Sequence, residues 1–346
     1  MRIDFHFYTI YALARSSGFN PDDAYVIAYS SQYTDDAVDE KRILFEDRDY
    51  IDQIMTSHKV YDPSTLLDRT CRMVWVPFHF LPGNEGTDFF ERMAAKADGY
   101  IAKEIIRRLL ETPRLTYSLH LLGIILHAYA DTWSHQNFLG LRHDMNNISD
   151  LKIFNQDISE YTPTDIDILN LGHVQAGHIP DEPYIDWEYK DYKGELLTIS
   201  NTERTLRAAK CCYDLLLNFF NKFPKFEPFE IIPWENITGK LKELFSFSGD
   251  IKRCEKIWKS AISNGEIGFT PSGRDLNIDY NENDWFELAI DERRVVEGDN
   301  EFTVFEKKIG YESSGWKHFN EAASFYRSDL FFRICNEIGL EIMNNI

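Results

Sequence analysis

Hydrophobic positions recur at helical spacing along most of the chain, and this pattern predicts a protein built mainly of helices. The second helix begins at Asn20-Pro21, where an N-cap residue is followed by a proline in the first turn. Helices are predicted at about 4–17, 21–34, 86–111, 114–138, 201–222, 235–246, 250–264 and 314–343.

Three segments interrupt the helical pattern. Two prolines and several β-formers within 73–84 favour an extended loop. The stretch 139–199 is rich in Asp, Asn, Pro, Gly and Tyr, and we expect loops there with a short β-ribbon near 184–199. Residues 265–312 are acidic and also predicted to be mostly loop. The fold class we predict is all-α, a helical bundle with additional C-terminal helices.

Prolines at 224, 228 and 233 mark the place where the apolar pattern weakens. We therefore predict a metal-binding helical core over 1–225 and a C-terminal helical extension over 226–346. The extension can equally pack back on the same core, since 346 residues are enough for one large domain or two modest ones.

Composition narrows the classes of function. Hydrophobic residues make up 43% of the chain, which indicates a packed globular protein. A net charge of −20 disfavours general electrostatic binding to nucleic acid or to an anionic membrane. The five cysteines form no C-x-x-C pair, and the most apolar stretch, near 119–130, is too short to span a membrane. We expect a cytoplasmic protein without a transmembrane segment; its protein partners stay unknown.

The most informative motif is H-x-x-x-D-x-x-x-H, formed by His127, Asp131 and His135 on an apolar helix. Positions four apart on a helix advance by roughly 40°, so the three side chains share one face. Two imidazoles around a carboxylate are expensive to bury without a charge partner. The motif therefore predicts metal binding, against the simpler interpretation of a few hydrogen-bonded polar residues on a core helix.

Further histidines and carboxylates occur in the same half of the chain. His6 lies on the first predicted helix, Asp35 and its neighbour Asp36 end the second, and His79 lies between two phenylalanines in a proline-bounded loop. A glycine-containing segment supplies three more candidate ligands: His173, His178 and Asp181.

This ordered series resembles the superfamily of zinc-dependent phospholipases C and S1/P1-type nucleases over roughly residues 1–185. The resemblance rests on an early helical His6, on Ser31-Gln32-Tyr33-Thr34-Asp35-Asp36, on Phe78-His79-Phe80-Leu81-Pro82, on His127 with Asp131, and on Asn170-Leu171-Gly172-His173. The run from Asp131 to Phe138 is similar to a D-x-x-x-H-x-N-F variant of Het-C-like proteins. The chain also resembles an uncharacterised bacterial family of this architecture.

The chain departs from the superfamily pattern in three places. The histidine that follows the core aspartate, His135, comes four residues after Asp131 instead of six. The superfamily's N-terminal tryptophan, which binds metal through its amine, is replaced by Met1, with Asp4 as a nearby substitute. The carboxylate expected four residues after His173 is Gly177, so His178 or Asp181 must replace it. The number of bound ions is therefore two or three.

The resemblance implies a zinc-dependent hydrolase of phosphate esters, phospholipase C-like or nuclease-like. It makes Asp35 the bridging, catalytic carboxylate, and His6, His79, His127, Asp131, His135 and His173 the metal ligands. The alternative is a non-catalytic interaction or scaffold protein with structural metal ions. A ferritin-like di-iron oxidase is disfavoured because the Glu-x-x-His pairs of that class are missing around the motif. The substrate class stays open.

Overall fold

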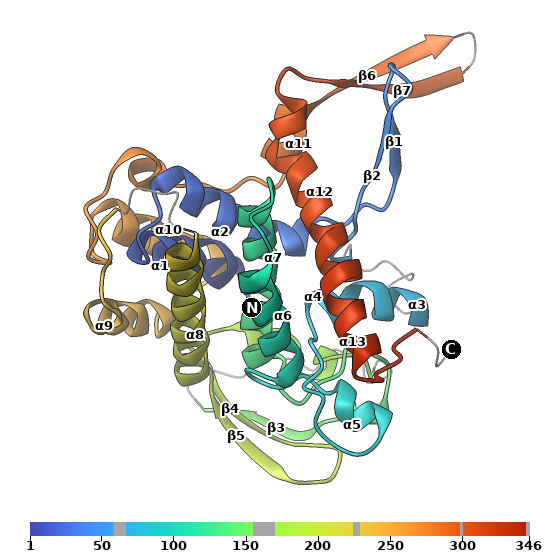
Figure 1. Ribbon diagram of the computed structural model, residues 1–346. Coiled ribbons are helices and arrows are strands. Elements are labelled where there is room, and N and C mark those ends of the chain that lie inside the picture. The colour runs from blue at the N-terminus through green and yellow to red at the C-terminus, as the bar shows by residue number, and fades with distance from the viewer. Residues whose placement is uncertain (59–66, 155–169, 224–228, 298–299, 344–346) are drawn as a thin grey trace.

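The computed structural model describes residues 1–58, 67–154, 170–223, 229–297 and 300–343. The long helices pack into a bundle, and small sheets lie at its edges (Figure 1). The α-helices of ten or more residues are α2 (Pro21–Asp36), α6 (Tyr100–Glu111), α7 (Ser118–Ser134), α8 (Asn201–Lys222), α9 (Trp234–Phe245), α10 (Ile251–Ser263) and α12 (Gly315–Phe325).

Shorter helical segments connect the long helices. They include π-helical η1 (Asp4–Thr9), η3 (Cys71–Trp75) and η10 (Tyr326–Phe332), the α-helices α1 (Ile10–Ser16), α3 (Asp68–Thr70), α4 (Val76–Phe78), α5 (Phe89–Met93), α11 (Asp284–Ala289) and α13 (Arg333–Glu337), and the 3₁₀ turns η4 (Asp144–Asn146), η6 (Val174–Ala176), η7 (Ile179–Asp181), η8 (Gly273–Asn277) and η9 (Tyr311–Ser313).

Helix α7 lies at the centre of the bundle and contacts α2, α8 and α12. Its sequence is apolar on nearly every side, and nearly all of its residues are buried, as expected for a helix surrounded by other helices. Gly123 permits the closest approach, because a Cβ at this position would lie 2.4 Å from the carbonyl oxygen of Ile27 on α2. The contact holds α2 tightly against the helix that bears the H-x-x-x-D-x-x-x-H motif.

The C-terminal segments share the main hydrophobic core with the N-terminal ones. Trp285 of α11 stacks on Tyr29 of α2 with ring centroids 3.9 Å apart. The guanidinium of Arg15 is fully buried and donates to the Asp275 carboxylate, which also accepts a bond from the Tyr11 hydroxyl. The boundary that we predicted between 225 and 226 falls within 224–228, outside the described residues.

The prediction of an all-α fold is wrong. In the described part of the chain, seven strands form three small antiparallel sheets, although helices dominate. The sheets pair β1 (Arg42–Leu44) with β2 (Tyr50–Asp52), β3 (Ser149–Ile153) with β4 (Asp186–Lys190) and β5 (Leu196–Ser200), and β6 (Ile290–Glu297) with β7 (Asn300–Lys307). The predicted β-ribbon near 184–199 is confirmed by β4 and β5.

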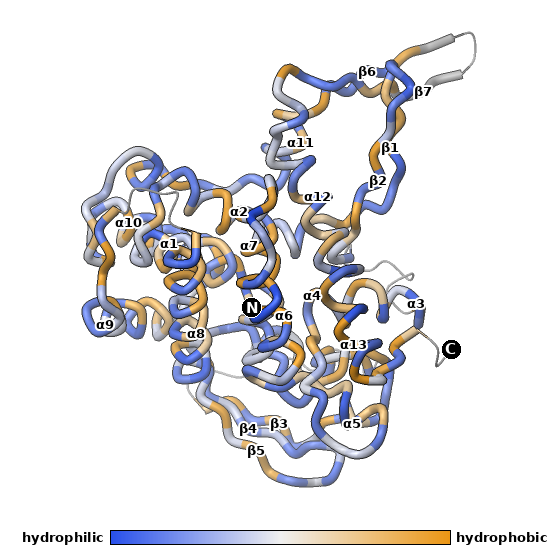
Figure 2. The backbone as a smooth tube through the Cα atoms, in the orientation of Figure 1, coloured by the Kyte–Doolittle hydropathy of each residue, from blue (hydrophilic) through white to orange (hydrophobic). Residues whose placement is uncertain are grey.

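The missed hairpins form an arm that stands away from the helices at the upper right of Figure 1. We call β1–β2 and β6–β7 together the β-arm; the two hairpins meet at a parallel bridge between Phe45 and Phe305. Hydrophilic and hydrophobic stretches both occur along it (Figure 2). Strands β1 and β2 have only three residues each, and residues 291–294 of β6 are all charged and exposed, so neither provides the run of alternating positions by which a half-buried strand is recognised.

Individual helices also differ from the predictions. The helix predicted at 201–222 is confirmed as α8, and the one at 21–34 as α2. Segment 73–84, predicted to be extended, begins as helix, because α4 continues directly from η3 and includes Pro77. The predicted helix at 86–111 is instead divided into α5 and α6. The one predicted at 314–343 is continuous from Gly315 to Glu337 as α12, η10 and α13, and it ends six residues earlier than predicted. Among the described residues, no helix combines the length and apolarity needed to cross a membrane.

Candidate metal centre

Eight of the predicted site residues come together around the C-terminal half of α7. They come from five parts of the chain, and each lies in or beside a helical segment that fixes its backbone. The eight are His6 on η1, Asp35 on α2, His79 after α4, His127 and Asp131 on α7, His135 at its C-cap, His173 before η6 and Asp181 in η7.

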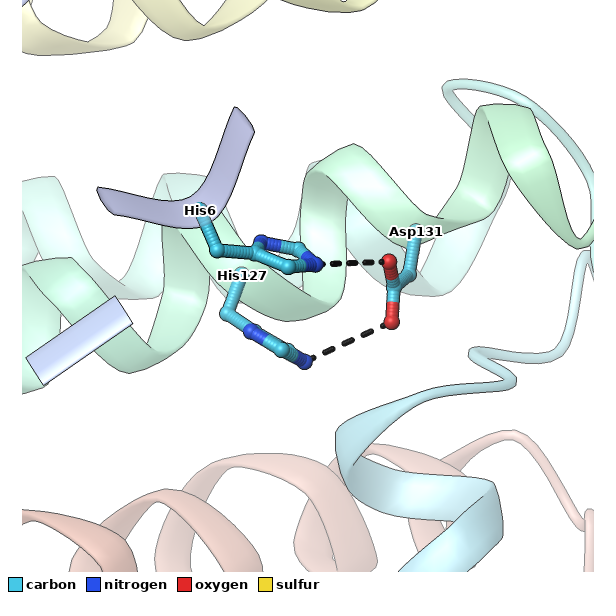
Figure 3. A group of neighbouring side chains, drawn as sticks. All are labelled: His6, His127 and Asp131. Carbon is cyan, nitrogen blue, oxygen red and sulfur yellow. Dashed lines mark hydrogen bonds and ion pairs between the residues drawn. The ribbon is translucent and has the colours of Figure 1, made fainter. Parts of the chain in front are cut away.

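The first group of donors is His6, His127 and Asp131, shown in Figure 3. His6 Nε2 lies 3.1 Å from Asp131 Oδ1, and His127 Nε2 lies 3.4 Å from Asp131 Oδ2. The two imidazoles stack with centroids 3.8 Å apart. All three side chains are at most 1% exposed, so this group is closed to solvent.

A second group shares His127 with the first and adds His79 and Asp35. Asp35 Oδ1 lies 3.7 Å from both His79 Nδ1 and His127 Nε2, and those two nitrogens are 3.2 Å apart. The side chain of Asp35 is 30% exposed, whereas both histidines are buried. Asp35 therefore forms the edge of the centre that solvent reaches.

The third group consists of His135, His173 and Asp181. His135 Nε2 lies 3.2 Å from Asp181 Oδ1, and His173 Nε2 lies 3.4 Å from Asp181 Oδ2. The amine of Met1 joins this group to the first, since it lies 2.7 Å from Asp131 Oδ1 and 3.0 Å from Asp181 Oδ1. The three groups therefore form one continuous centre.

Backbone carbonyls fix the orientation of four imidazoles. His127 Nδ1 donates to Ser31 O at 2.8 Å, and His135 Nδ1 donates to His79 O at 2.7 Å. His79 and His173 donate in the same way to Thr56 O and Gly177 O. Because a carbonyl only accepts, the donating nitrogen carries the hydrogen, and in a neutral ring the other nitrogen presents a lone pair to the centre.

Burial and neighbouring charges shift the titration of these groups. Burial first, and then the positive Met1 amine, lower the pKa of His6 to about 4. Burial and the adjacent His6 lower the pKa of His127 to about 4, and burial also lowers the pKa of His173 to about 4. Three of the rings are therefore neutral at pH 7, the form in which histidine binds metal.

The carboxylates and His79 show the opposite balance. Burial opposes ionisation of Asp131 and Asp181, but the Met1 amine and the surrounding histidines outweigh it and hold both pKa values well below the usual range. Burial lowers the pKa of His79, yet its bond to Asp131 and the charge of Asp35 raise the pKa above the ordinary value. The centre therefore retains negative charge and attracts cations.

The arrangement of donors fits divalent cations. In their neutral forms, His127, His135 and His173 aim lone pairs at carboxylate oxygens 3.2–3.4 Å away, an arrangement in which acceptor faces acceptor. A cation between them converts this repulsion into coordination. Imidazole nitrogen combined with carboxylate oxygen is a donor set that suits Zn²⁺.

The structure separates the two residues that the sequence left as alternatives. Asp181 lies within the third group, whereas His178 is exposed and belongs to none of the three groups found among the described residues. Asp4, offered as a substitute ligand, instead pairs with Arg2 at 3.0 Å. We also expected α7 to extend through His135; the helix ends at Ser134, and the C-cap conformation turns the His135 ring toward Asp181.

Two features of the centre were missed by sequence reasoning. The contact of the Met1 amine with Asp131 and Asp181 was missed because we interpreted Met1 as the loss of a ligand, although the resemblance implies an N-terminal amine at this centre. The carbonyl of Thr56, which orients His79, is a backbone atom in a segment without a motif. Both depend on how distant segments pack together.

The fold and the centre define an α-rich protein with a buried cluster of histidines and aspartates that could hold metal ions. The chain belongs to a family of unknown function, DUF6765, whose model matches residues 1–334. The match covers every residue of the centre. No curated protein and no solved structure matches the chain.

Proposed function

We propose that the chain is a metal-dependent hydrolase of phosphate esters, with zinc as the metal. The observation that supports this best is the geometry of the second group, where Asp35 lies between two buried histidines and still reaches solvent. A catalytic metal site keeps one position open, whereas a structural site is closed. The resemblance to zinc-dependent phospholipases C and S1/P1-type nucleases gives the same expectation.

The residues of the centre have distinct roles in this proposal. Zinc ions bound there would acidify a water molecule and stabilise the negative charge that develops on phosphate. Asp35 accepts a proton from the attacking water and orients it, because it is the most exposed carboxylate of the three groups. His6, His127 and Asp131 hold their positions deep in the bundle, where no substrate reaches them.

The alternative function is a non-catalytic scaffold in which metal ions stabilise the bundle. The complete burial of His6, His127 and Asp131 favours it, since closed coordination is typical of structural sites. The two functions differ in what they require of Asp35. A scaffold tolerates its replacement, whereas a hydrolase loses turnover.

The test uses zinc-loaded protein and three phosphate esters: bis-p-nitrophenyl phosphate, short single-stranded oligonucleotides and phosphatidylcholine. We expect at least one to be hydrolysed, and we expect Asp35→Asn to lower the rate by about 10²–10⁴-fold, the usual contribution of a positioned general base. The matched control is Asp22→Asn, which changes an 82% exposed carboxylate at the other end of the same helix. Hydrolysis of none of the three esters, or equal rates for Asp35→Asn and Asp22→Asn, would favour the scaffold.

A further inference from the structure

Strand β6 has a free edge. It forms a two-stranded sheet with β7, and the two strands pair residue by residue along their whole length. On the other side of β7, Phe305 bridges to Phe45, and the carbonyl of Phe305 accepts a hydrogen bond from Glu46 N. Strand β7 therefore lies between β6 and the β1–β2 hairpin (Figure 1), and no described strand pairs with the outer edge of β6.

The hydrogen bonds of the hairpin fix which main-chain groups of β6 face outward. Lys308 N donates to Ala289 O at 2.9 Å, which sets the phase of the ladder at the start of the strand. In an antiparallel pair, residues that bond to the partner strand alternate with residues that do not. Counting from Ala289, the odd-numbered residues of β6 bond to β7. The even-numbered residues therefore direct their N–H and C=O groups to the free edge.

The charges on this edge can either prevent or favour pairing. A regular, unpaired edge is a template for another strand, and proteins commonly protect such an edge with charged side chains. In β6 the acidic pair Asp291 and Glu292 is followed by the basic pair Arg293 and Arg294, and all four residues are exposed. The segment is therefore neutral in a chain of net charge −20. Whether its charges repel a second strand depends on the register.

A second copy of β6 fits this edge in one register. When a two-fold axis relates two antiparallel strands, one residue lies opposite its own copy. With Arg293 on the axis, each Glu292 lies opposite Arg294 of the second copy, and the outward N–H and C=O groups of the two strands meet. Cβ atoms of opposite residues are about 4.5–5.5 Å apart, so both pairs are within reach of an ion pair. About eight main-chain hydrogen bonds accompany them.

The neighbouring registers fit less well. With Arg294 on the axis, two Arg294 side chains meet and Glu292 loses its opposite charge. With Glu292 on the axis, two carboxylates meet and the pairing is shorter, because α11 ends just before β6 begins. The first register also brings two Arg293 side chains together, but each one is already paired with Glu46 at 2.7 Å and with Glu306 at 3.1 Å.

We propose that two copies of the chain associate through β6, which pairs antiparallel with β6 of the second copy and joins the two hairpins into one sheet. A two-stranded hairpin is marginally stable by itself in water, and the added strands stabilise it. The outer edge of β7 is occupied at Phe305 by the β1–β2 hairpin, so association stops at two copies. This inference is independent of the proposed hydrolase activity, since it concerns the mass of the protein in solution.

The experiment is sedimentation velocity of the full chain over a concentration series up to about 100 µM. We expect a species with twice the mass of one chain, in a proportion that grows with concentration. A chain that stays monomeric over the whole series overturns the proposal. Assemblies that grow beyond two copies also overturn it, because the proposed pairing is closed by its two-fold axis.

Charge reversals test the register. Arg294→Glu places a carboxylate opposite Glu292 of the second copy at two symmetric positions, and it should raise the Kd of the dimer by about tenfold or more. Glu292→Arg should do the same, because it places two guanidinium groups opposite each other. Both side chains are exposed, so the variants keep the fold.

The double variant, Glu292→Arg with Arg294→Glu, exchanges the two charges and makes them complementary again. Its Kd should return to within about threefold of that of the unmodified protein. Arg333→Glu is the matched control, since this side chain is 68% exposed on α13, outside the β-arm, and its Kd should not change. Unchanged Kd values in both single variants, or a double variant as weak as the single ones, would overturn the proposal.

Discussion

The metal centre and the β-arm both depend on charged pairs, but the two regions place them in opposite surroundings. In the centre, Asp131 is 1% exposed and pairs with the Met1 amine at 2.7 Å. On the β-arm, Arg42 and Asp52 approach to 2.6 Å, and their side chains are 55% and 54% exposed. The shorter contact is the weaker one, because water screens exposed pairs and leaves most of them worth about 0–1 kcal/mol. The contact distance alone therefore does not show which region gains more stability from its ion pairs.

Removing the central carboxylate has the largest expected effect. Asp131→Ala removes one of the two carboxylates that pair with the buried Met1 amine and should lower the free energy of unfolding by about 3–5 kcal/mol. It should also lower the bound metal per chain, measured by mass spectrometry on zinc-incubated protein. His120→Ala is the control, because His120 lies on the same helix, is buried and belongs to none of the three groups.

Treatment with a metal chelator tests the same role of Asp131 in a second way. EDTA should lower the melting temperature of the unmodified protein and of His120→Ala, since ligands from distant segments bind metal only in the folded state. EDTA should change the melting temperature of Asp131→Ala very little. Equal metal content in Asp131→Ala and His120→Ala would contradict the role given to Asp131.

His120 is responsible for the next largest expected effect, a fall in the free energy of unfolding when the pH is lowered. Burial, and then the neighbouring His318, lower the pKa of His120 from 6.5 to about 3. The His120 side chain therefore takes up a proton near pH 6.5 in the unfolded chain but only near pH 3 in the folded chain. Stability from this group is present above pH 6.5 and is lost as the pH falls toward 3.

The measurement is urea unfolding at pH 7 and pH 5 for the unmodified protein and His120→Ala. The difference in unfolding free energy between them should shift by about 2 kcal/mol in favour of the variant at the lower pH. A difference that stays constant between the two pH values would show that His120 does not titrate as its burial requires.

The β-arm gives the smallest effect. Arg42→Met keeps the aliphatic stem and removes the exposed bond to Asp52, and we expect no measurable change in the free energy of unfolding, because water screens the pair. The same urea titration at pH 7 measures it. A loss as large as that of Asp131→Ala would mean that the arm supports the bundle and that the contrast between the two regions is wrong.

The same contrast explains what could be predicted from the sequence. The residues of the centre are rare in type and regular in spacing, so helical periodicity alone predicts His127 and Asp131 on one helix face, and α7 confirms it. The strands of the β-arm are either three residues long or rich in exposed charged residues, so the sequence pattern did not indicate strands and the all-α prediction failed there. The choice between His178 and Asp181 was also beyond the sequence. It depends on a turn in which Gly177 adopts a φ of 56°, after which η7 directs Asp181 inward.

One shared imidazole limits how many ions the centre can hold at once. His127 is a member of both the first and the second group, but its Nδ1 is occupied by the carbonyl of Ser31. Only the lone pair of Nε2 is left, and one lone pair serves one ion. Filling either group with its complete donor set therefore deprives the other of a ligand. If the centre binds metal as we propose, full coordination would allow two ions per chain, because the first and second groups compete for His127 as a ligand.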